Sequence, residues 1–176
     1  MIGLKMYEKL LNKYAINQLG YIVDDLEEAA RAHSALFGSG PFLYLDPITM
    51  DKFDYKGKPI TVTTQIAYGQ YGDVQIELIK VLSEPNPYFE DGRIGFHHVS
   101  VWVDDFEGAI ADFAEAGFKP ICEMVSGGGL HIAYIDCREK WGHCVEIHSP
   151  IKGFWDSVAN KAKDWDGQEP FRKFPG

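Results

Sequence analysis

The chain has 176 residues, 45% of them hydrophobic, which is enough to bury the core of one domain or of two small modules that share a core. A formal net charge of −9 argues against nucleic acid or an anionic membrane surface as a partner, since both would repel the chain. Three cysteines without a C-x-x-C pair, and no apolar run of membrane-spanning length, predict a reduced, cytoplasmic protein without a disulfide framework or a zinc knuckle.

The N-terminal half is predicted to hold a helical extension and a module with the element order β-α-β-β-β. Apolar residues at helical spacing favour a short amphipathic helix in the extension, residues 1–15. The module, residues 16–81, has a helix over 26–37 with Asp25 as its N-cap and Gly38 as its stop signal. Its strands are expected at 16–23, 42–45, 60–68 and 74–81, with a loop over 46–59.

The second half repeats this order after a linker. Residues 82–95 contain several prolines and glycines and separate the two modules. In the second module, residues 96–149, a helix is expected from 106 to 117, and strands are expected at 96–103, 118–124, 130–136 and 144–148. Residues 150–176 are a C-terminal extension rich in aromatic residues, which we expect to pack over the sheet or against a partner subunit.

An internal repeat indicates two copies of one structural unit. Residues 16–27 align with 96–107 at a constant offset of 80 (98 − 18 = 80), which places Gln18 at the position of His98. The remaining matched pairs, on the third and fourth strands, are Gln65 with His131 and Glu77 with Glu146.

Four polar residues on the matched strands are predicted to share one face of the sheet, opposite the apolar face that the helices cover. They are Gln18, Glu77, His98 and Glu146. Together they offer one nitrogen and three oxygens to a divalent cation, a set that suits Mn, Fe(II), Co, Ni or Zn. Taken singly, such a glutamate is commonly a solvent-facing strand residue and such a histidine a hydrogen-bonded core residue. Four of them at equivalent positions of a repeat favour a metal site.

Several other polar and aromatic residues could belong either to a cavity or to the structural framework of the sheet. Gln65 and His131 either line the cavity or are ordinary strand residues. His97 alternates with the neighbouring valines and is predicted to be a structural residue on their face. A hydrophobic lining for a substrate, or else part of the core, is expected of three aromatic residues: Trp102, Tyr68 and Tyr134.

The duplicated order, with polar residues on the first and last strands of each copy, resembles the vicinal oxygen chelate superfamily. That superfamily includes glyoxalase I, methylmalonyl-CoA epimerase, extradiol dioxygenases and the fosfomycin and bleomycin resistance proteins. The resemblance covers about residues 16–149 and is strongest in Gln18-Leu19-Gly20-Tyr21-Ile22-Val23-Asp24-Asp25 and Gly95-Phe96-His97-His98-Val99. It implies an α+β fold in which two paired βαβββ modules form a cupped mixed sheet, with helices on the outer face. The implied ligands of one divalent metal ion are Gln18, Glu77, His98 and Glu146.

The resemblance also implies an activity, namely an isomerase, epimerase or lyase that acts through a metal-stabilised enolate of a small carbonyl substrate. Glu146 is the expected base, and Glu77 would serve the opposite face of the substrate. The linker residues 84–88 are similar to the epimerase branch, whereas glutamine at position 18 is closer to glyoxalase I. Ile22 stands where glyoxalase I typically has an arginine for glutathione, which argues against glutathione as a substrate.

Two other functions remain open at this point. One is a non-catalytic binding or resistance protein that sequesters an aromatic ligand in the cup, which the aromatic tail and the 46–59 loop favour. The other is an extradiol-type dioxygenase, which normally uses two histidines and one glutamate. The expected partners are a small-molecule substrate and a second copy of the chain in a homodimer.

Overall fold

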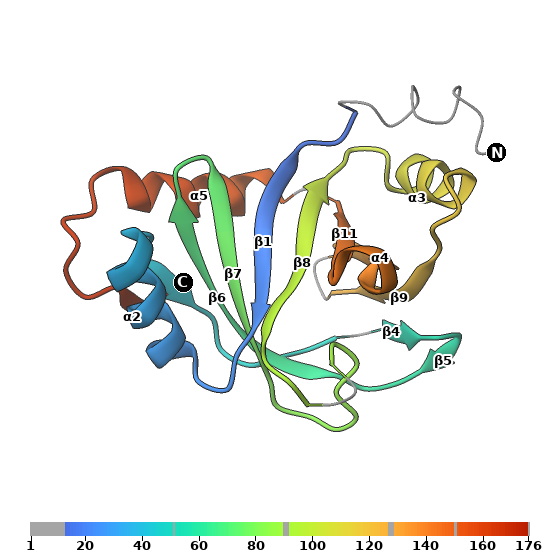
Figure 1. Cartoon of the computed structure of the whole chain (residues 1–176). Helices are drawn as coiled ribbons and strands as arrows, with labels where there is room; N and C mark the ends of the chain where they lie inside the picture. The colour runs from blue at the N-terminus through green and yellow to red at the C-terminus, as the bar shows by residue number, and fades with distance from the viewer. Residues whose placement is uncertain (1–12, 51, 90–91, 127–128, 150, 176) are drawn as a thin grey trace.

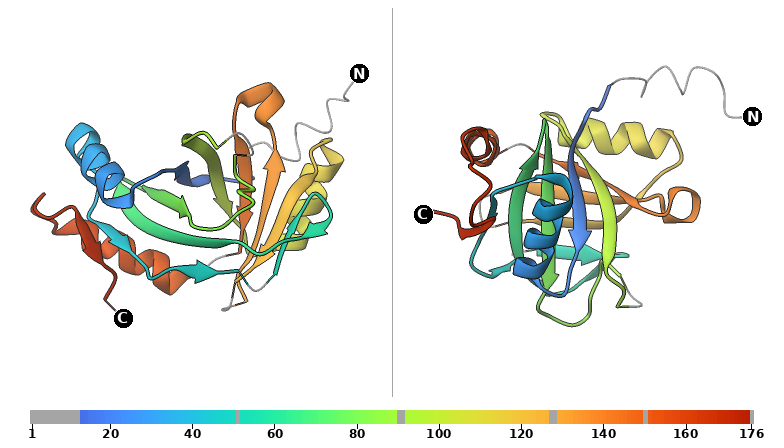
Figure 2. Two further views of the ribbon diagram at one scale, coloured as in Figure 1. Left: turned by 90° about the horizontal axis from the view of Figure 1, so that it is seen from below. Right: turned by 60° about the vertical axis from the view of Figure 1, so that its left-hand side comes forward.

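Twelve strands form one mixed sheet that curves into a cup (Figures 1 and 2). The computed structural model describes residues 13–50, 52–89, 92–126, 129–149 and 151–175. The strand order is β12-β2-β6-β7-β1-β8-β11-β10-β9-β4-β5, and β3 pairs with β6 beside this path. The helix expected in the N-terminal extension falls almost wholly on residues 1–12, outside the described residues.

The first half of the chain has the predicted order of a strand, a helix and further strands. Its helix α2 is Leu26–Phe37, and its main strands are β1 (Ile16–Ile22), β2 (Phe42–Tyr44), β6 (Thr63–Tyr71) and β7 (Val74–Val81). Asp25 caps α2 by accepting a hydrogen bond of 2.9 Å from the backbone N–H of Glu28, and Gly38 ends it with a φ of 69°. The predicted cap and stop of this helix are therefore confirmed.

The second half repeats the arrangement and joins the first through the two opening strands. Its elements are β8 (Gly95–Trp102), α3 (Phe106–Glu115), β9 (Pro120–Val125), β10 (His131–Asp136), the short helix α4 (Arg138–Trp141) and β11 (Cys144–His148). β1 pairs antiparallel with β8, while each of them pairs in parallel with the last strand of its own half, β7 or β11. These four strands therefore lie side by side at the centre of the cup.

Period-two alternation along the strands separates an inner from an outer apolar surface. On the outer face, α2 packs over residues such as Ala67 and Leu78, and α3 packs over Val101 and Ile147. An inner cluster fills the cup and includes Ile22, Ile66, Ile79, Met124 and Ile132. The fold is thus the expected α+β architecture with α2 and α3 on the outer face.

The segment 46–59 was expected to be a loop, and this prediction is wrong. It contains three short strands, β3 (Ile48–Thr49), β4 (Lys52–Tyr55) and β5 (Lys58–Pro59). β4 crosses to the second half and pairs antiparallel with β9, with Phe53 opposite Met124. Phe53 is only 3% exposed, so burial of this aromatic side chain in the inner cluster stabilises the crossing.

The C-terminal extension packs on the sheet of its own chain, which was one of the two expected places. Helix α5 (Lys152–Lys163) contributes Trp155 and Val158 to the inner cluster, so it lies on the inner side of the sheet, unlike α2 and α3 (Figure 2). Strand β12 (Phe171–Lys173) pairs in parallel with β2. None of the described helices combines the length and apolarity needed to cross a membrane.

Candidate metal centre and cavity

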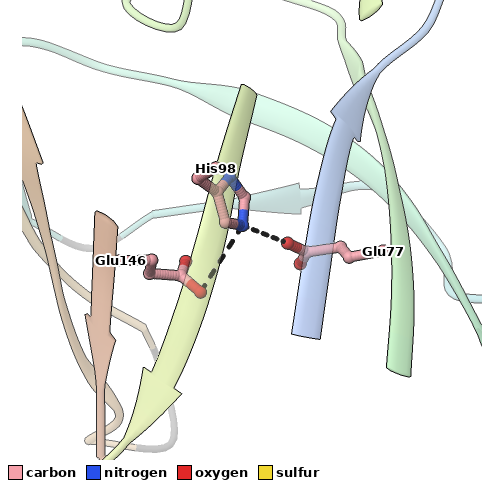
Figure 3. Close-up of side chains that lie close together, drawn as sticks. All are labelled: Glu77, His98 and Glu146. Carbon is pink, nitrogen blue, oxygen red and sulfur yellow. Dashed lines mark ion pairs between the residues drawn. The ribbon is translucent and has the colours of Figure 1, made fainter. Parts of the chain in front are cut away.

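The four central strands bring a histidine and two glutamates together on the inner face of the cup. Glu77 lies on β7, His98 on β8 and Glu146 on β11, and their side chains converge (Figure 3). Nε2 of His98 is 3.3 Å from Oε2 of Glu77 and 3.6 Å from Oε2 of Glu146. All three residues are buried, with exposed fractions of 6% or less. One donor atom from each lies within 4.8 Å of the others, a separation that a single ion can bridge.

A glycine on β1 makes this convergence possible. β1 lies between β7 and β8, and Gly20 is in register with both Glu77 and His98. The imidazole of His98 occupies the space above Gly20, because a Cβ atom there would lie only 2.0 Å from Cε1 of the ring. Any other residue at position 20 would push the imidazole away from Glu77.

Burial shifts the pKa values of the three groups and leaves one donor atom of each without a hydrogen bond to the described residues. It raises the pKa of Glu77 to about 7 and also raises the pKa of Glu146, an effect that the neighbouring His98 opposes. Burial likewise lowers the pKa of His98. Oε2 of each glutamate and Nε2 of His98 have no hydrogen-bond partner among the described residues. Unpaired polar atoms in the interior are costly, and a divalent cation between them would satisfy all three at once.

The raised pKa of Glu77 predicts a pH dependence for the metal-free protein. Between pH 4.5 and 7 the folded state binds more protons at Glu77 than the unfolded chain does, so the free energy of unfolding falls as the pH rises through this window. The loss amounts to about 3 kcal/mol, at about 1.4 kcal/mol for each unit of pKa. The buried residues His97, His98 and His148 act in the opposite direction, because their lowered pKa values make the folded state bind fewer protons than the unfolded chain. The contribution of Glu77 is therefore measured as the difference in pH dependence between the parent and Glu77→Gln, by urea unfolding of the metal-free proteins at pH 5 and pH 8.

Glutamine at position 77 is neutral at every pH, so from pH 5 to pH 8 the free energy of unfolding of Glu77→Gln should fall by less than that of the parent, or should rise. Glu123→Gln removes an exposed carboxylate on β9 and serves as the matched control, which should behave like the parent. An unchanged pH dependence in Glu77→Gln would contradict the assignment of the destabilisation to this buried carboxylate.

Gln18 lies on the same inner face, one pleat away from Gly20 on β1. It is 1% exposed, and the strand register places it opposite Ser100, which in turn is opposite Glu146. Its Nε2 donates a hydrogen bond of 2.5 Å to Oε1 of Gln75, and its own Oε1 has no partner among the described residues. An amide oxygen without a hydrogen bond to the described residues is therefore present on the same face of the sheet as the three converging groups.

His97 does not lie on the face of the valines, where alternation alone had placed it. The register of β1 and β8 shifts between the pairs Gly20–His98 and Tyr21–Phe96, so His97 is the extra residue of a β-bulge. Its ring packs against Tyr88 at 5.3 Å and Tyr134 at 5.2 Å between ring centroids.

The bulge also brings the two histidine rings into contact. Nδ1 of His97 is 3.0 Å from Nδ1 of His98, so one of these nitrogens donates a hydrogen bond and the other accepts it. When Nε2 of His98 offers its lone pair to a cation, Nδ1 of His98 carries the proton and donates to His97. His97 then carries its own proton on Nε2, because its Nδ1 accepts the hydrogen bond from His98.

Glu77 and Glu146, two of the three converging residues, line a cavity of about 150 Å³. Tyr68 and Tyr134 both line this cavity, and Trp102 stacks on the lining residue Trp155 with ring centroids 5.2 Å apart. Gln65 and His131 lie three residues before these tyrosines, so alternation turns them to the outer face. Neither is among the described residues that line the cavity.

The two residues on the outer face have other surroundings. Nε2 of Gln65 donates a hydrogen bond of 3.2 Å to the backbone oxygen of Leu45. His131 is exposed and packs against Phe106 of α3, with ring centroids 5.5 Å apart. We therefore do not include Gln65 and His131 in the candidate site.

His148 lines the cavity, although the sequence analysis did not identify it as a candidate residue. It is 4% exposed, its Nδ1 has no hydrogen-bond partner among the described residues, and burial lowers its pKa to about 4. The imidazole is therefore neutral near pH 7. Its position two residues after Glu146 on β11 is the signal that places it on the inner face.

Comparison with known proteins gives a family for this arrangement. The model of the Glyoxalase/Bleomycin resistance protein/Dioxygenase superfamily matches residues 17–134. No match was found among curated proteins.

Solved structures share the fold at low sequence identity. A hypothetical protein from Bacillus halodurans C-125 has a TM-score of 0.57 and 20% identity, over 79% of this chain and 96% of that one. Methylmalonyl-CoA epimerase from Mycobacterium tuberculosis has a TM-score of 0.56 and 18% identity, over 80% and 91%. A Streptomyces coelicolor methylmalonyl-CoA epimerase has a TM-score of 0.51 and 15% identity, over 77% and 96%. At these identities the likeness establishes the fold.

Proposed function

The chain belongs to the glyoxalase/bleomycin resistance protein/dioxygenase superfamily, the vicinal oxygen chelate proteins, and from this we propose that it is a divalent-metal-dependent isomerase, epimerase or lyase acting through the enolate of a small carbonyl compound. The observation that carries the proposal is the convergence of three buried donor atoms that make no hydrogen bond to the described residues, two of them on glutamates that line a largely apolar cavity. The proposed ligands are Gln18, Glu77, His98 and Glu146. The proposed ion is Zn, Ni, Co, Mn or Fe(II).

The bound ion would supply Lewis-acid stabilisation of the negative charge that develops on two neighbouring substrate oxygens. Glu146 is the proposed base, because a glutamate that leaves the metal ion can accept a proton from the bound substrate. Glu77 lies on the opposite side of His98 from Glu146 (Figure 3), so it faces the reacting carbon from another direction. Two carboxylates on opposite sides are what an epimerase needs in order to remove a proton from one face and return it to the other.

The role proposed for Gln18 gives a prediction of its own. Gln18→His should keep a stoichiometric metal ion, because the imidazole supplies a donor nitrogen in place of the amide oxygen. Gln18→Leu removes the donor and should lower the affinity for metal. Metal content per chain, measured by mass spectrometry of protein purified without chelator, checks both variants. Full retention in Gln18→Leu, or loss in Gln18→His, would exclude Gln18 as a ligand.

A sequestering protein is the second candidate, and the aromatic lining of the cavity favours it. The cavity that Glu77 and Glu146 line has five aromatic lining residues: Tyr68, Tyr88, Tyr134, Phe154 and Trp155. A pure sequestering protein needs no metal, so stoichiometric metal in the purified protein would decide against it. An extradiol-type dioxygenase normally has two histidines and one glutamate, whereas the convergent group here has one histidine and two glutamates. The cytoplasmic location and the homodimer stay predictions from the sequence.

A further inference from the structure

The size of the cavity restricts what can enter it. At about 150 Å³ it is smaller than the roughly 300–1,000 Å³ of pockets that hold drug-sized ligands. Most of its lining is aliphatic or aromatic, from β6, β9, β10, α5 and the segment after β2, with Ile66, Met124, Ile132, Phe154 and Leu45 as examples. A ligand that fills this space must be compact and must present an apolar body to these side chains.

The charges around the cavity restrict the ligand further. The described lining residues include the two glutamates at the base but no lysine or arginine. A divalent cation would balance Glu77 and Glu146, and nothing in the described lining would then balance a phosphate or a free carboxylate. Burying an unpaired anion is costly, so an uncharged ligand is favoured. Transfer of a proton from such a ligand to Glu146 also leaves the total charge of the site unchanged.

The C-terminal extension sets this restriction. Phe154 and Trp155 belong to α5, which lies outside the residues 17–134 that match the family model. Trp155 packs against Tyr68 at 5.2 Å and His148 at 5.3 Å between ring centroids, so α5 fills part of the cup with aromatic side chains. Phe154 also contacts Tyr68, at 5.3 Å. This extension leaves little room for a long substrate above the donor groups.

Neutral hydrogen-bonding groups are nevertheless present in the lining. Nδ1 of His148 is buried without a partner among the described residues, and so is Nε1 of Trp155. Both residues line the cavity. A hydroxyl or carbonyl group of a ligand would satisfy these atoms, whereas a hydrocarbon would leave them unpaired.

On the basis of the proposed function, we infer that the substrate is a compact, uncharged compound with two neighbouring oxygens on an apolar, ring-sized body. Coenzyme A esters, phosphorylated compounds and carboxylates are excluded from the class. Trp155 and Phe154 determine this specificity by limiting the space, and His148 binds a polar group of the substrate.

A set of three probes tests the inference by isothermal titration calorimetry on the Co²⁺-loaded protein. The first is α-hydroxyacetophenone, which has a hydroxyl beside a ketone on a phenyl ring and no charge. The second is mandelate, which has the same ring and two neighbouring oxygens but carries a carboxylate, and the third is propionyl-CoA. We expect α-hydroxyacetophenone to bind about tenfold more tightly than either of the others, and to change the visible spectrum of the cobalt. Tighter binding of mandelate or propionyl-CoA would overturn the inference.

Paired variants show whether the lining causes the preference. Ser126 lines the cavity and is half-buried, so Ser126→Arg adds a cation there and should improve mandelate binding about tenfold, while Ser126→Gln should not. Trp155→Leu should weaken the binding of α-hydroxyacetophenone, while Trp141→Leu, at a residue that is 68% exposed, should not. Equal mandelate affinities in Ser126→Arg and Ser126→Gln would overturn the electrostatic part of the inference.

The outcome for the metal separates the two proposals. If Co²⁺ binds stoichiometrically but α-hydroxyacetophenone does not bind, the substrate class is wrong and the metal-dependent function stands. If Co²⁺ does not bind at all, the proposed function fails, and the substrate class that rests on it fails as well.

Discussion

Replacing His98 with alanine is expected to remove stoichiometric divalent metal from the protein while the fold persists. His98 supplies the only nitrogen among the proposed ligands, and its Nε2 faces both glutamates at 3.3 and 3.6 Å. Loss of residues that merely orient a metal ligand typically costs about 10- to 100-fold in affinity, so the loss of a ligand should cost more than about a hundredfold. Metal content per chain measures the effect, and circular dichroism confirms that the variant is folded.

The chain offers a matched control for this experiment. His131→Ala removes an exposed histidine from the outer face of the sheet and should leave the metal content unchanged. Glu146→Ala should behave like His98→Ala, because it removes a second donor from the same group. Parent-like metal content in both His98→Ala and Glu146→Ala would mean that these residues do not form a metal centre.

The second large effect is expected from Glu146→Gln, in the chemistry rather than in metal binding. An enolate mechanism requires that a hydrogen on the carbon next to the carbonyl be removed, and this hydrogen then exchanges with deuterium from heavy water. The glutamine keeps an oxygen donor and the shape of the side chain but is no base. Loss of one general base costs about 10²- to 10⁴-fold, so the exchange rate should fall by that factor.

Proton NMR of α-hydroxyacetophenone with the metal-loaded protein in heavy water measures this rate. Glu123→Gln, an exposed carboxamide substitution on β9, should exchange at the rate of the parent. If Glu146→Gln also exchanges at the parent rate, Glu146 is not the base, and Glu77 becomes the candidate on the opposite side of His98. Tight binding without any exchange, in protein that holds no metal, would favour the sequestering function.

The sequence predicted those positions of the candidate site that depend on strand alternation within a repeat. Glu77 and Glu146 lie between aliphatic residues in matched strands, so their common face follows from the period of two alone. Gln18 and His98 follow from the offset of 80 in the same way. These inferences needed no knowledge of which strands are neighbours.

The predictions that failed depended on pairing between strands. The face of His97 is set by a bulge that exists only because β1 and β8 pair with a shift of register. β4 was missed although it also pairs with the adjacent β5, because its longer pairing is with β9 in the other half of the chain, where Phe53 is buried. Matching the two halves of the chain placed Gln65 and His131 at equivalent positions. That equivalence does not say which face of the sheet the two side chains occupy.

The pairing of β4 with β9 has a consequence for how the protein is made. Lys52 pairs with Val125, a residue synthesised 73 positions later (125 − 52 = 73). At about 5–20 residues per second, the ribosome adds those residues in roughly 4–15 seconds, during which β4 can pair only with the adjacent short strand β5 and not with β9. Phe53 stays unburied for that time, whereas β6 and β7 can already form their hairpin. β4 therefore pairs with β9 only after the second half of the chain has begun to fold. Until then the nascent chain exposes the aromatic side chain of Phe53, which chaperones can recognise.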